Sequence, residues 1–215
     1  MDFWVIDADL VLKLLLLLLI GMGPKIALVP FLEKTKNFDP ETQRAIGRRM
    51  VLIAVVTAIV LYAAGSLLMR LLHIGGEAVA VAGAIILGIL AIGMVSAPGK
   101  KPEVEEPGVQ QDPKQIAVYP LAIPYLLNPA GITLLVIASA EVVSVASAGL
   151  VLGLILVVGA FDYLVFSNID KLSKRLNPVS LVVSEVVFGV LLAAVAVQLM
   201  IFGLETLGII TATSH

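Results

Sequence analysis

Among the ionisable side chains inside the long apolar runs of this 215-residue chain, the informative ones are Lys25, Asp162 and Glu185. A charged side chain near the centre of a bilayer costs roughly 2.5–3.5 kcal/mol or more, so each should face protein or water. At a rise of 1.5 Å per residue, all three lie about 6–10 Å below the same membrane boundary. Lys25 can therefore pair with either acid, and the acid left in excess can bind and release a proton. Asp162 and Glu185 are thus candidates for proton coupling.

Two readings without proton coupling remain open. Lys25 can reach the membrane interface along its aliphatic stem, with the acids hydrated. Alternatively, Lys25 and Asp162 can form a permanent ion pair, with Glu185 in water. Of the two acids, Asp162 is favoured for coupling, because its short side chain cannot easily reach the interface from its depth.

Two proline-containing breaks interrupt apolar runs at Gly23-Pro24 and at Asn128-Pro129. Proline lacks the backbone N–H and frees the carbonyl one turn earlier, and in a bilayer the freed group must meet protein or water. Each proline taken alone is compatible with a tolerated kink, but the two lie 105 residues apart, at matching places of two halves. Such paired breaks indicate a transport site. We therefore expect Gly23, Pro24, Lys25, Asn128 and Pro129 to bind substrate in one cavity near the bilayer middle, where Asn128 offers an amide.

The composition is that of an all-α membrane protein. Hydrophobic residues make up 60% of the chain, charged residues 14%, and the mean hydropathy is +1.07. A soluble domain has roughly 25% charged residues, so a soluble enzyme, a nucleic-acid binder and a disordered chain are excluded. A bilayer-spanning helix needs about 20 apolar residues. Six runs qualify: 10–32, 51–72, 77–97, 116–140, 147–166 and 181–204.

The distribution of Lys and Arg predicts the orientation. Eleven of the 14 cations fall in the loops 33–50, 98–115 and 167–180, which lie on one side if six helices alternate. On the other side stands only Arg70, at the end of the run 51–72. Because cytoplasmic loops carry the excess of Lys and Arg, both termini are expected on the periplasmic or extracellular side.

The segment 98–115 divides the chain into two parts. It is rich in proline and acidic residues, which is typical of a flexible linker. The parts 1–97 and 116–215 then hold three helices each, and an odd number makes the second part run in the opposite direction. We therefore expect two inverted three-helix repeats, with the first helix of each repeat interrupted.

Small residues recur every four positions on two of the expected helices: Ala80, Ala84 and Gly88 on the third, and Gly149 and Gly153 on the fifth. This spacing lets helix backbones approach closely. It predicts a tight bundle and leaves open whether the packing is within one chain or between copies, so a homo-oligomer is compatible with it.

No residue pattern predicts enzymatic, metal or cofactor chemistry. The chain has no Cys, and its two histidines, His73 and His215, are far apart, with His73 expected at a helix end in the interface. The run 93–101 does not fit a phosphate loop, which needs a second glycine five places after the first, because Pro98 stands five places after Gly93. We therefore expect no catalytic residue, no metal and no cofactor, and any transport should be driven by a gradient.

Two stretches resemble the signatures of the MarC family of multi-pass inner-membrane proteins. The first is GMGPKIALVPFL at 21–32, with Gly23 where the usual Asn-Pro-x-Gly-x-x-Pro pattern has asparagine. The second is IAVYPLAIP at 116–124, followed by NPAGI at 128–132. The resemblance extends to Gly208. It implies a six-helix bacterial or archaeal inner-membrane protein similar to the LysE-type exporters, and some MarC-like proteins are described as transporters of small neutral amino acids.

The favoured interpretation is a secondary transporter of a small polar metabolite, such as a neutral amino acid, coupled to protons or another ion. The half-helix N-termini at the breaks suit a carboxylate, and the freed carbonyls suit an ammonium group. The expected partners are the lipid bilayer and a small solute, with no nucleic acid. Two other functions stay open: a channel with a continuous wetted path, and a membrane scaffold that docks a partner without transport.

Overall fold

The computed structural model describes residues 8–96, 112–141, 144–169 and 178–210, apart from the side chains of residues 9, 178–182, 184 and 185. The described residues form helices and short connections. In chain order the helices are α1 (Ala8–Met22), α2 (Pro24–Thr35), α3 (Pro40–Leu72), α4 (Gly76–Ser96), α5 (Pro113–Ile116), η1 (Ala117–Leu126), α6 (Pro129–Glu141), α7 (Val145–Ser167) and α9 (Pro178–Thr206).

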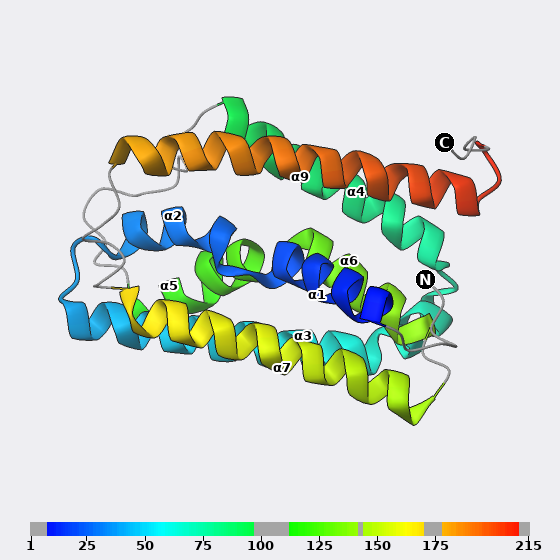
Figure 1. The fold of residues 1–215 in the computed structure, drawn as a ribbon, viewed down its shortest axis with the longest axis horizontal. Helices are drawn as coiled ribbons and strands as arrows, with labels where there is room; N and C mark the ends of the chain where they lie inside the picture. The colour runs from blue at the N-terminus through cyan, green and yellow to red at the C-terminus, as the bar shows by residue number, and fades with distance from the viewer. Residues whose placement is uncertain (1–7, 97–111, 142–143, 170–177, 211–215) are drawn as a thin grey trace.

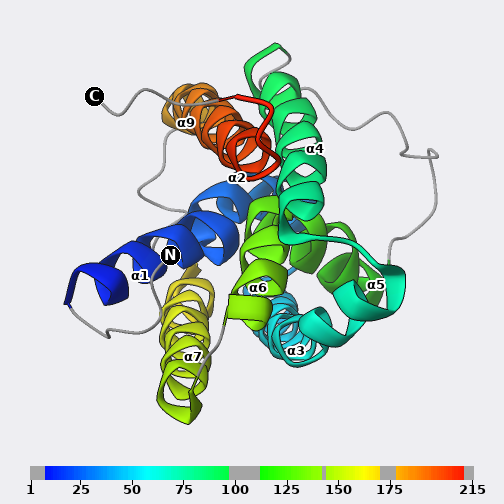
Figure 2. The same cartoon turned by 90° about the vertical axis from the view of Figure 1, so that its right-hand side faces the viewer.

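The helices are stacked in three layers (Figure 1, Figure 2). Helices α4 and α9 pack along each other as one outer layer, and α3 and α7 form the other. The shorter helices α1, α2, η1 and α6 lie between them, and α1 contacts α6 while α2 contacts η1. The largest buried side chains of this region include Met22, Phe31, Met50, Leu121 and Phe166. The two interrupted segments therefore occupy the interior of the protein.

All six expected spans are present as helical segments. Five are long and apolar enough to cross a membrane, and the first of these, Leu10–Thr35, includes the break at Gly23. The sixth consists of Pro113–Leu126 and Pro129–Ala140, which are bent by 70° relative to each other. The start of α1 and the end of α9 lie at the same end of the bundle (Figure 1). This agrees with an even number of crossings.

Helix α3 begins earlier than the sequence predicted. We expected a loop over 33–50, but the helix starts at Pro40, so Arg44, Arg48 and Arg49 stand on its first turns. Asp39 is the N-cap residue and accepts hydrogen bonds from the backbone N and Oγ1 of Thr42, at 2.9 and 2.7 Å. A proline in the first turn and a capping aspartate are strong helix-start signals, and they extend the helix beyond its apolar part.

The small residues pack less regularly than their spacing predicted. Ala80 and Ala84 are buried, but a Cβ atom added to Gly88, Gly149 or Gly153 would meet nothing within 4 Å. Close helix contacts arise at other glycines: Gly47 against Phe166, Gly65 against Ser139, and Gly83 against Thr133. Close helix contacts are therefore present, but the predicted glycines Gly88, Gly149 and Gly153 do not form them among the described residues.

His73 ends α3 as its C-cap residue, in the left-handed conformation (φ 52°), and its side chain is exposed. The expectation of a histidine at a helix end is confirmed.

Candidate functional site

The first break separates α1 from α2 at Gly23. Its backbone is extended (φ −85°, ψ 163°), and α2 starts with Pro24. The N-cap residue of α2 is Gly23, which has no side chain, and no side-chain cap is formed there among the described residues. A Cβ atom at position 23 would collide with the carbonyl oxygen of Leu19, so only glycine fits at this position without a shift of the backbone. The first turn of α2 therefore keeps N–H groups that no side-chain cap satisfies, at the positive end of the helix dipole.

The second break separates η1 from α6 at Leu127 and Asn128. Asn128 is 1% exposed, and its Oδ1 accepts hydrogen bonds from the backbone N of Ala130 (2.9 Å) and of Gly131 (3.2 Å). Asn128 thus caps α6, which begins at Pro129. Upstream, η1 is irregular, with extended backbone at Tyr119 and Ile123. Pro120 and Pro124 follow these two residues, and proline disfavours helical backbone in the residue before it.

The two breaks touch each other. The backbone N of Asn128 donates to the carbonyl oxygen of Gly21 at 2.9 Å, and its Nδ2 donates to that of Ile20 at 2.7 Å. A Cβ atom on Gly21 would collide with the backbone of Gly131, and one on Gly131 with Gly21. The C-terminal carbonyls of α1, which have no partner in their own helix, are thereby satisfied by the second break.

The amide of Asn128 is therefore already engaged. From the sequence we predicted that this amide binds a solute. In the structure its Nδ2 donor and its Oδ1 acceptor both bind backbone groups of the protein. Asn128 and Pro129 support the contact between the two breaks, which we call the crossing. The helix start that remains without a side-chain cap is that of α2. The sequence did not single out the Gly21–Gly131 contact, although two glycines close to paired proline breaks are a signal for a close backbone approach.

Lys25 does not contact Asp162, one of the two acids with which the sequence allowed it to pair. The side chain is exposed, and its Nζ lies 5.6 Å from the ring centroid of Phe188 on α9. No ion pair joins it to Asp162, whose two carboxylate oxygens have no hydrogen-bond partner among the described residues. The permanent Lys25–Asp162 pair is thus wrong for this conformation. Glu185 belongs to α9, but its side chain lies outside the described residues.

Asp162 is fully buried at the level of the first break. One turn before it on α7, Gly159 packs against Val55 and faces Met22, the last residue of α1. One turn after it, the ring of Phe166 lies 5.0 Å from that of Phe31 on α2. The carboxyl group therefore sits between these contacts, beside the part of the chain where α1 ends and α2 begins.

A cavity of about 380 Å³ borders the crossing on the side of α9. Ile20 and Ala130 line it next to the two breaks, and Gln198 is the one amide side chain among its described walls. None of the five residues predicted to bind substrate lines this cavity. Gln198 was not predicted as a site residue, although an amide inside the last apolar run was a signal for it.

The comparison with known families agrees with this architecture. The model of the MarC family of integral membrane proteins matches residues 8–208. A UPF0056 membrane protein of Pyrococcus abyssi is 24% identical over 199 residues, which cover 91% of this chain and 96% of that protein. The UPF0056 inner membrane protein YhgN of Escherichia coli K12 is 28% identical over 194 residues, covering 88% and 93%.

A UPF0056 membrane protein of Chlamydia muridarum is 31% identical over 176 residues, covering 82% of this chain and 83% of that protein. No solved structure matches the chain. The family match spans both breaks, the buried aspartate and all the helical spans, so the chain belongs to the MarC family of integral membrane proteins.

Proposed function

We propose that this protein is a secondary transporter of a small polar metabolite, of the size of a neutral amino acid, in the inner membrane of a bacterium or archaeon. The observation that carries the proposal is the contact between two broken membrane helices in the protein interior. Broken helices that meet are the usual site of substrates and coupling ions in such transporters. The relatives come from bacteria and archaea, and the one in Escherichia coli is named an inner membrane protein.

The two halves of the chain act, in this proposal, as inverted three-helix repeats joined by the segment 98–115. Support comes from the matching breaks at Gly23 and Asn128, each of which stands before a proline. The excess of Lys and Arg in three loops of one side supports a cytoplasmic location for that side, with both termini on the other.

The substrate carboxylate binds at the start of α2, where Gly23 and Pro24 leave the helix end without a side-chain cap. Backbone N–H groups and the helix dipole favour an anionic group at such a place. Lys25 stands in the same turn and adds positive charge from the outer face of the helix. Asn128 and Pro129 hold the opposite break in position, so that α2 moves against a fixed support.

Asp162 is the coupling group of the proposed cycle. Its carboxyl group is buried beside the first break and has no hydrogen-bond partner among the described residues. A carboxyl group in that position needs a partner, which a proton or the ammonium group of a substrate can supply. Glu185 on α9 is the second candidate for this role.

Counterflow in proteoliposomes tests the proposal. Purified protein is reconstituted into vesicles loaded with unlabelled glycine, alanine or serine, and uptake of the labelled compound is followed against wild-type and protein-free vesicles. A carrier accumulates label transiently above its outside concentration. Simple equilibration of the label contradicts a carrier and indicates a channel. Absence of flux across these and other small polar solutes contradicts transport and favours a scaffold.

Asp162→Asn tests the coupling group separately. The variant should keep counterflow but lose accumulation driven by a pH gradient. Asp39→Asn is the matched control, because that carboxyl group is exposed at the start of α3, and it should keep both activities. Normal pH-driven accumulation by Asp162→Asn would show that another group couples transport.

A further inference from the structure

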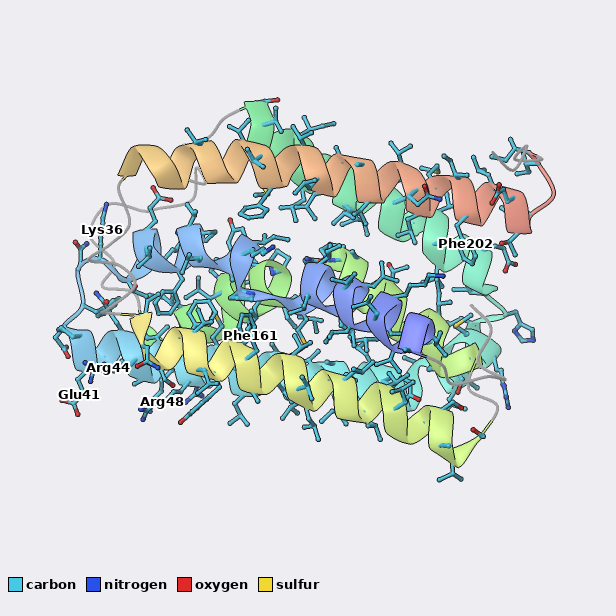
Figure 3. The ribbon with its side chains drawn as sticks, in the orientation of Figure 1. Lys36, Glu41, Arg44, Arg48, Phe161 and Phe202 are labelled. Carbon is cyan, nitrogen blue, oxygen red and sulfur yellow. The ribbon has the colours of Figure 1, made fainter. Side chains whose placement is uncertain are left out.

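A second cavity lies at the end of the bundle where α3 and α5 begin, away from the crossing of the broken helices. Its volume is about 630 Å³, and α3, α5 and α7 form its walls. Three cationic side chains line it, namely Arg48, Arg49 and Lys114. Figure 3 shows Arg48 at the same end of the protein as Arg44 and Lys36. The described residues that line the cavity include no carboxylate.

The three cations are available to an external anion. Their side chains are exposed, and none of them forms an ion pair within the part of the chain that the structure describes. The guanidinium group of Arg48 lies 5.8 Å from the ring centroid of Tyr163 on α7, which holds it at the cavity wall. A guanidinium group can bind phosphate oxygens through two parallel hydrogen bonds, and lysine adds a point charge.

The rest of the cavity is apolar and extends toward the membrane interior. Val51, Leu52 and Val55 follow the two arginines along α3, and Gly159 faces them from α7. Helix α3 has 33 residues and is about 50 Å long, whereas the hydrocarbon core of a bilayer is about 30 Å thick. Arg48 and Arg49 stand directly before the apolar part of α3 and thus at the level of lipid headgroups.

We propose that this cavity binds one anionic phospholipid of the adjacent leaflet. The headgroup phosphate lies between Arg48, Arg49 and Lys114, and the start of an acyl chain follows Val51 and Val55 into the bilayer. Basic pockets between membrane helices on the cytoplasmic side bind anionic headgroups by this combination of charge and apolar surface. The three cations of the site are not among the residues that form the contact between the two breaks, although the apolar end of the cavity reaches Val55 and Gly159, one turn before Asp162.

The shape of the cavity favours a lipid over the acidic segment that precedes α5. That segment contains Glu103, Glu105 and Glu106 and lies outside the described residues. Its carboxylates match the three cations in charge, but a carboxylate has no chemical match in the apolar part of the cavity. A phospholipid matches the charge and the apolar surface together, and its headgroup is already at the required depth.

Titration of the full-length protein in a neutral detergent tests the site, with binding followed by native mass spectrometry. The probes are dioctanoyl phosphatidylglycerol, dioctanoyl phosphatidylcholine and glycerol phosphate. Phosphatidylglycerol should bind most tightly, and the charge-free substitution Arg48→Gln should weaken it roughly fivefold, with Arg49→Gln adding about the same factor again. Binding of the zwitterionic lipid should not change with these substitutions.

Arg44→Gln is the matched control, because Arg44 stands at the same end of α3 but does not line the cavity. Equal losses in Arg44→Gln and Arg48→Gln would overturn the proposal in favour of a diffuse surface attraction. Glycerol phosphate binding as tightly as the lipid would overturn it in favour of a soluble anion. Tighter lipid binding after substitution of all three linker glutamates by Gln would show that the linker occupies the cavity instead.

Discussion

The two breaks of the central layer are alike in sequence and differ in structure. Each places a proline at the first position of a new helix, Pro24 for α2 and Pro129 for α6. Asn128 stands before the second proline, caps α6 and donates to a carbonyl of α1. Gly23 stands before the first proline and leaves α2 without a side-chain cap.

Proline therefore sets where a membrane helix breaks. The residue before the proline decides whether the first N–H groups of the new helix receive a side-chain cap. An asparagine satisfies the helix start from within the protein, and the break becomes a fixed support. A glycine leaves the first N–H groups of the helix without a side-chain acceptor. In our proposal the carboxylate of a substrate accepts their hydrogen bonds. Four predictions test this contrast.

The largest effect is expected at the capped break. Asn128→Ala removes three side-chain hydrogen bonds and strands the carbonyl of Ile20 and two N–H groups of α6 in a buried place. We expect a loss of about 3 kcal/mol in the free energy of unfolding. Thermal unfolding in detergent measures it. Asn128→Asp keeps the acceptor oxygen but loses the Nδ2 donor to the carbonyl of Ile20 on α1. It should therefore also lower the melting temperature. A melting temperature equal to wild type in Asn128→Ala would remove the contrast between the breaks.

The next effect concerns the close approach of the two breaks. Gly131→Ala puts a methyl group into the backbone of Gly21, and overpacking of this kind costs about 2 kcal/mol. Gly149→Ala is the control, because a Cβ atom there meets nothing within 4 Å in the described chain. It should leave the melting temperature unchanged. Similar melting temperatures for both variants would mean that the crossing is not tightly packed.

A smaller effect is expected when the first break is made like the second. Gly23→Asn introduces an asparagine before Pro24, as at the second break, but its Cβ atom would collide with the carbonyl oxygen of Leu19. We expect a net loss of about 1 kcal/mol in stability, together with loss of counterflow, because the new amide competes for the start of α2. A more stable variant with normal counterflow would contradict a binding role for the uncapped helix start.

The smallest effect should come from a capped helix start in water. Asp39→Ala removes the cap of α3, where water can replace the lost hydrogen bonds, so it should lower the melting temperature less than Asn128→Ala does. The backbone N–H of Thr42 lowers the pKa of the Asp39 carboxyl group below 3.8. Its contribution is therefore present above that pH and is lost as the pH falls through the folded-state pKa. The cap at Asn128 should not depend on pH, and unfolding curves at pH 3 and pH 6 compare the two.

Much of the fold follows from local patterns. The six apolar runs predicted the spans because a bilayer demands a minimum length of apolar helix, and each run is found as a helix or a broken pair. Both breaks were predicted from Pro24 and Pro129. The start of α3 was wrong by about three turns, because hydropathy marks the apolar part of a helix and not its cap at Asp39.

The candidate site was harder to predict. Equal depth allowed Lys25 and Asp162 to pair, but depth does not say which face of a helix a side chain occupies. Lys25 lies over Phe188, and Asp162 faces the interior. The amide of Asn128 was identified as a polar group near the breaks, while its partner Ile20 is 108 residues away and could not be read from local sequence.

Local sequence was enough to predict that this chain spans a membrane, which of its apolar runs are long enough to cross it and where two of its helices break. Length, hydropathy and the missing N–H of proline act within a few neighbouring residues. The tertiary structure was needed to show that Asn128 closes one break onto α1. It also shows that, among the described residues, no side chain caps the start of α2 and no group hydrogen-bonds to the buried Asp162. These outcomes depend on which helix faces which across the bundle, and that is set by side chains far apart in the chain packing at the same place.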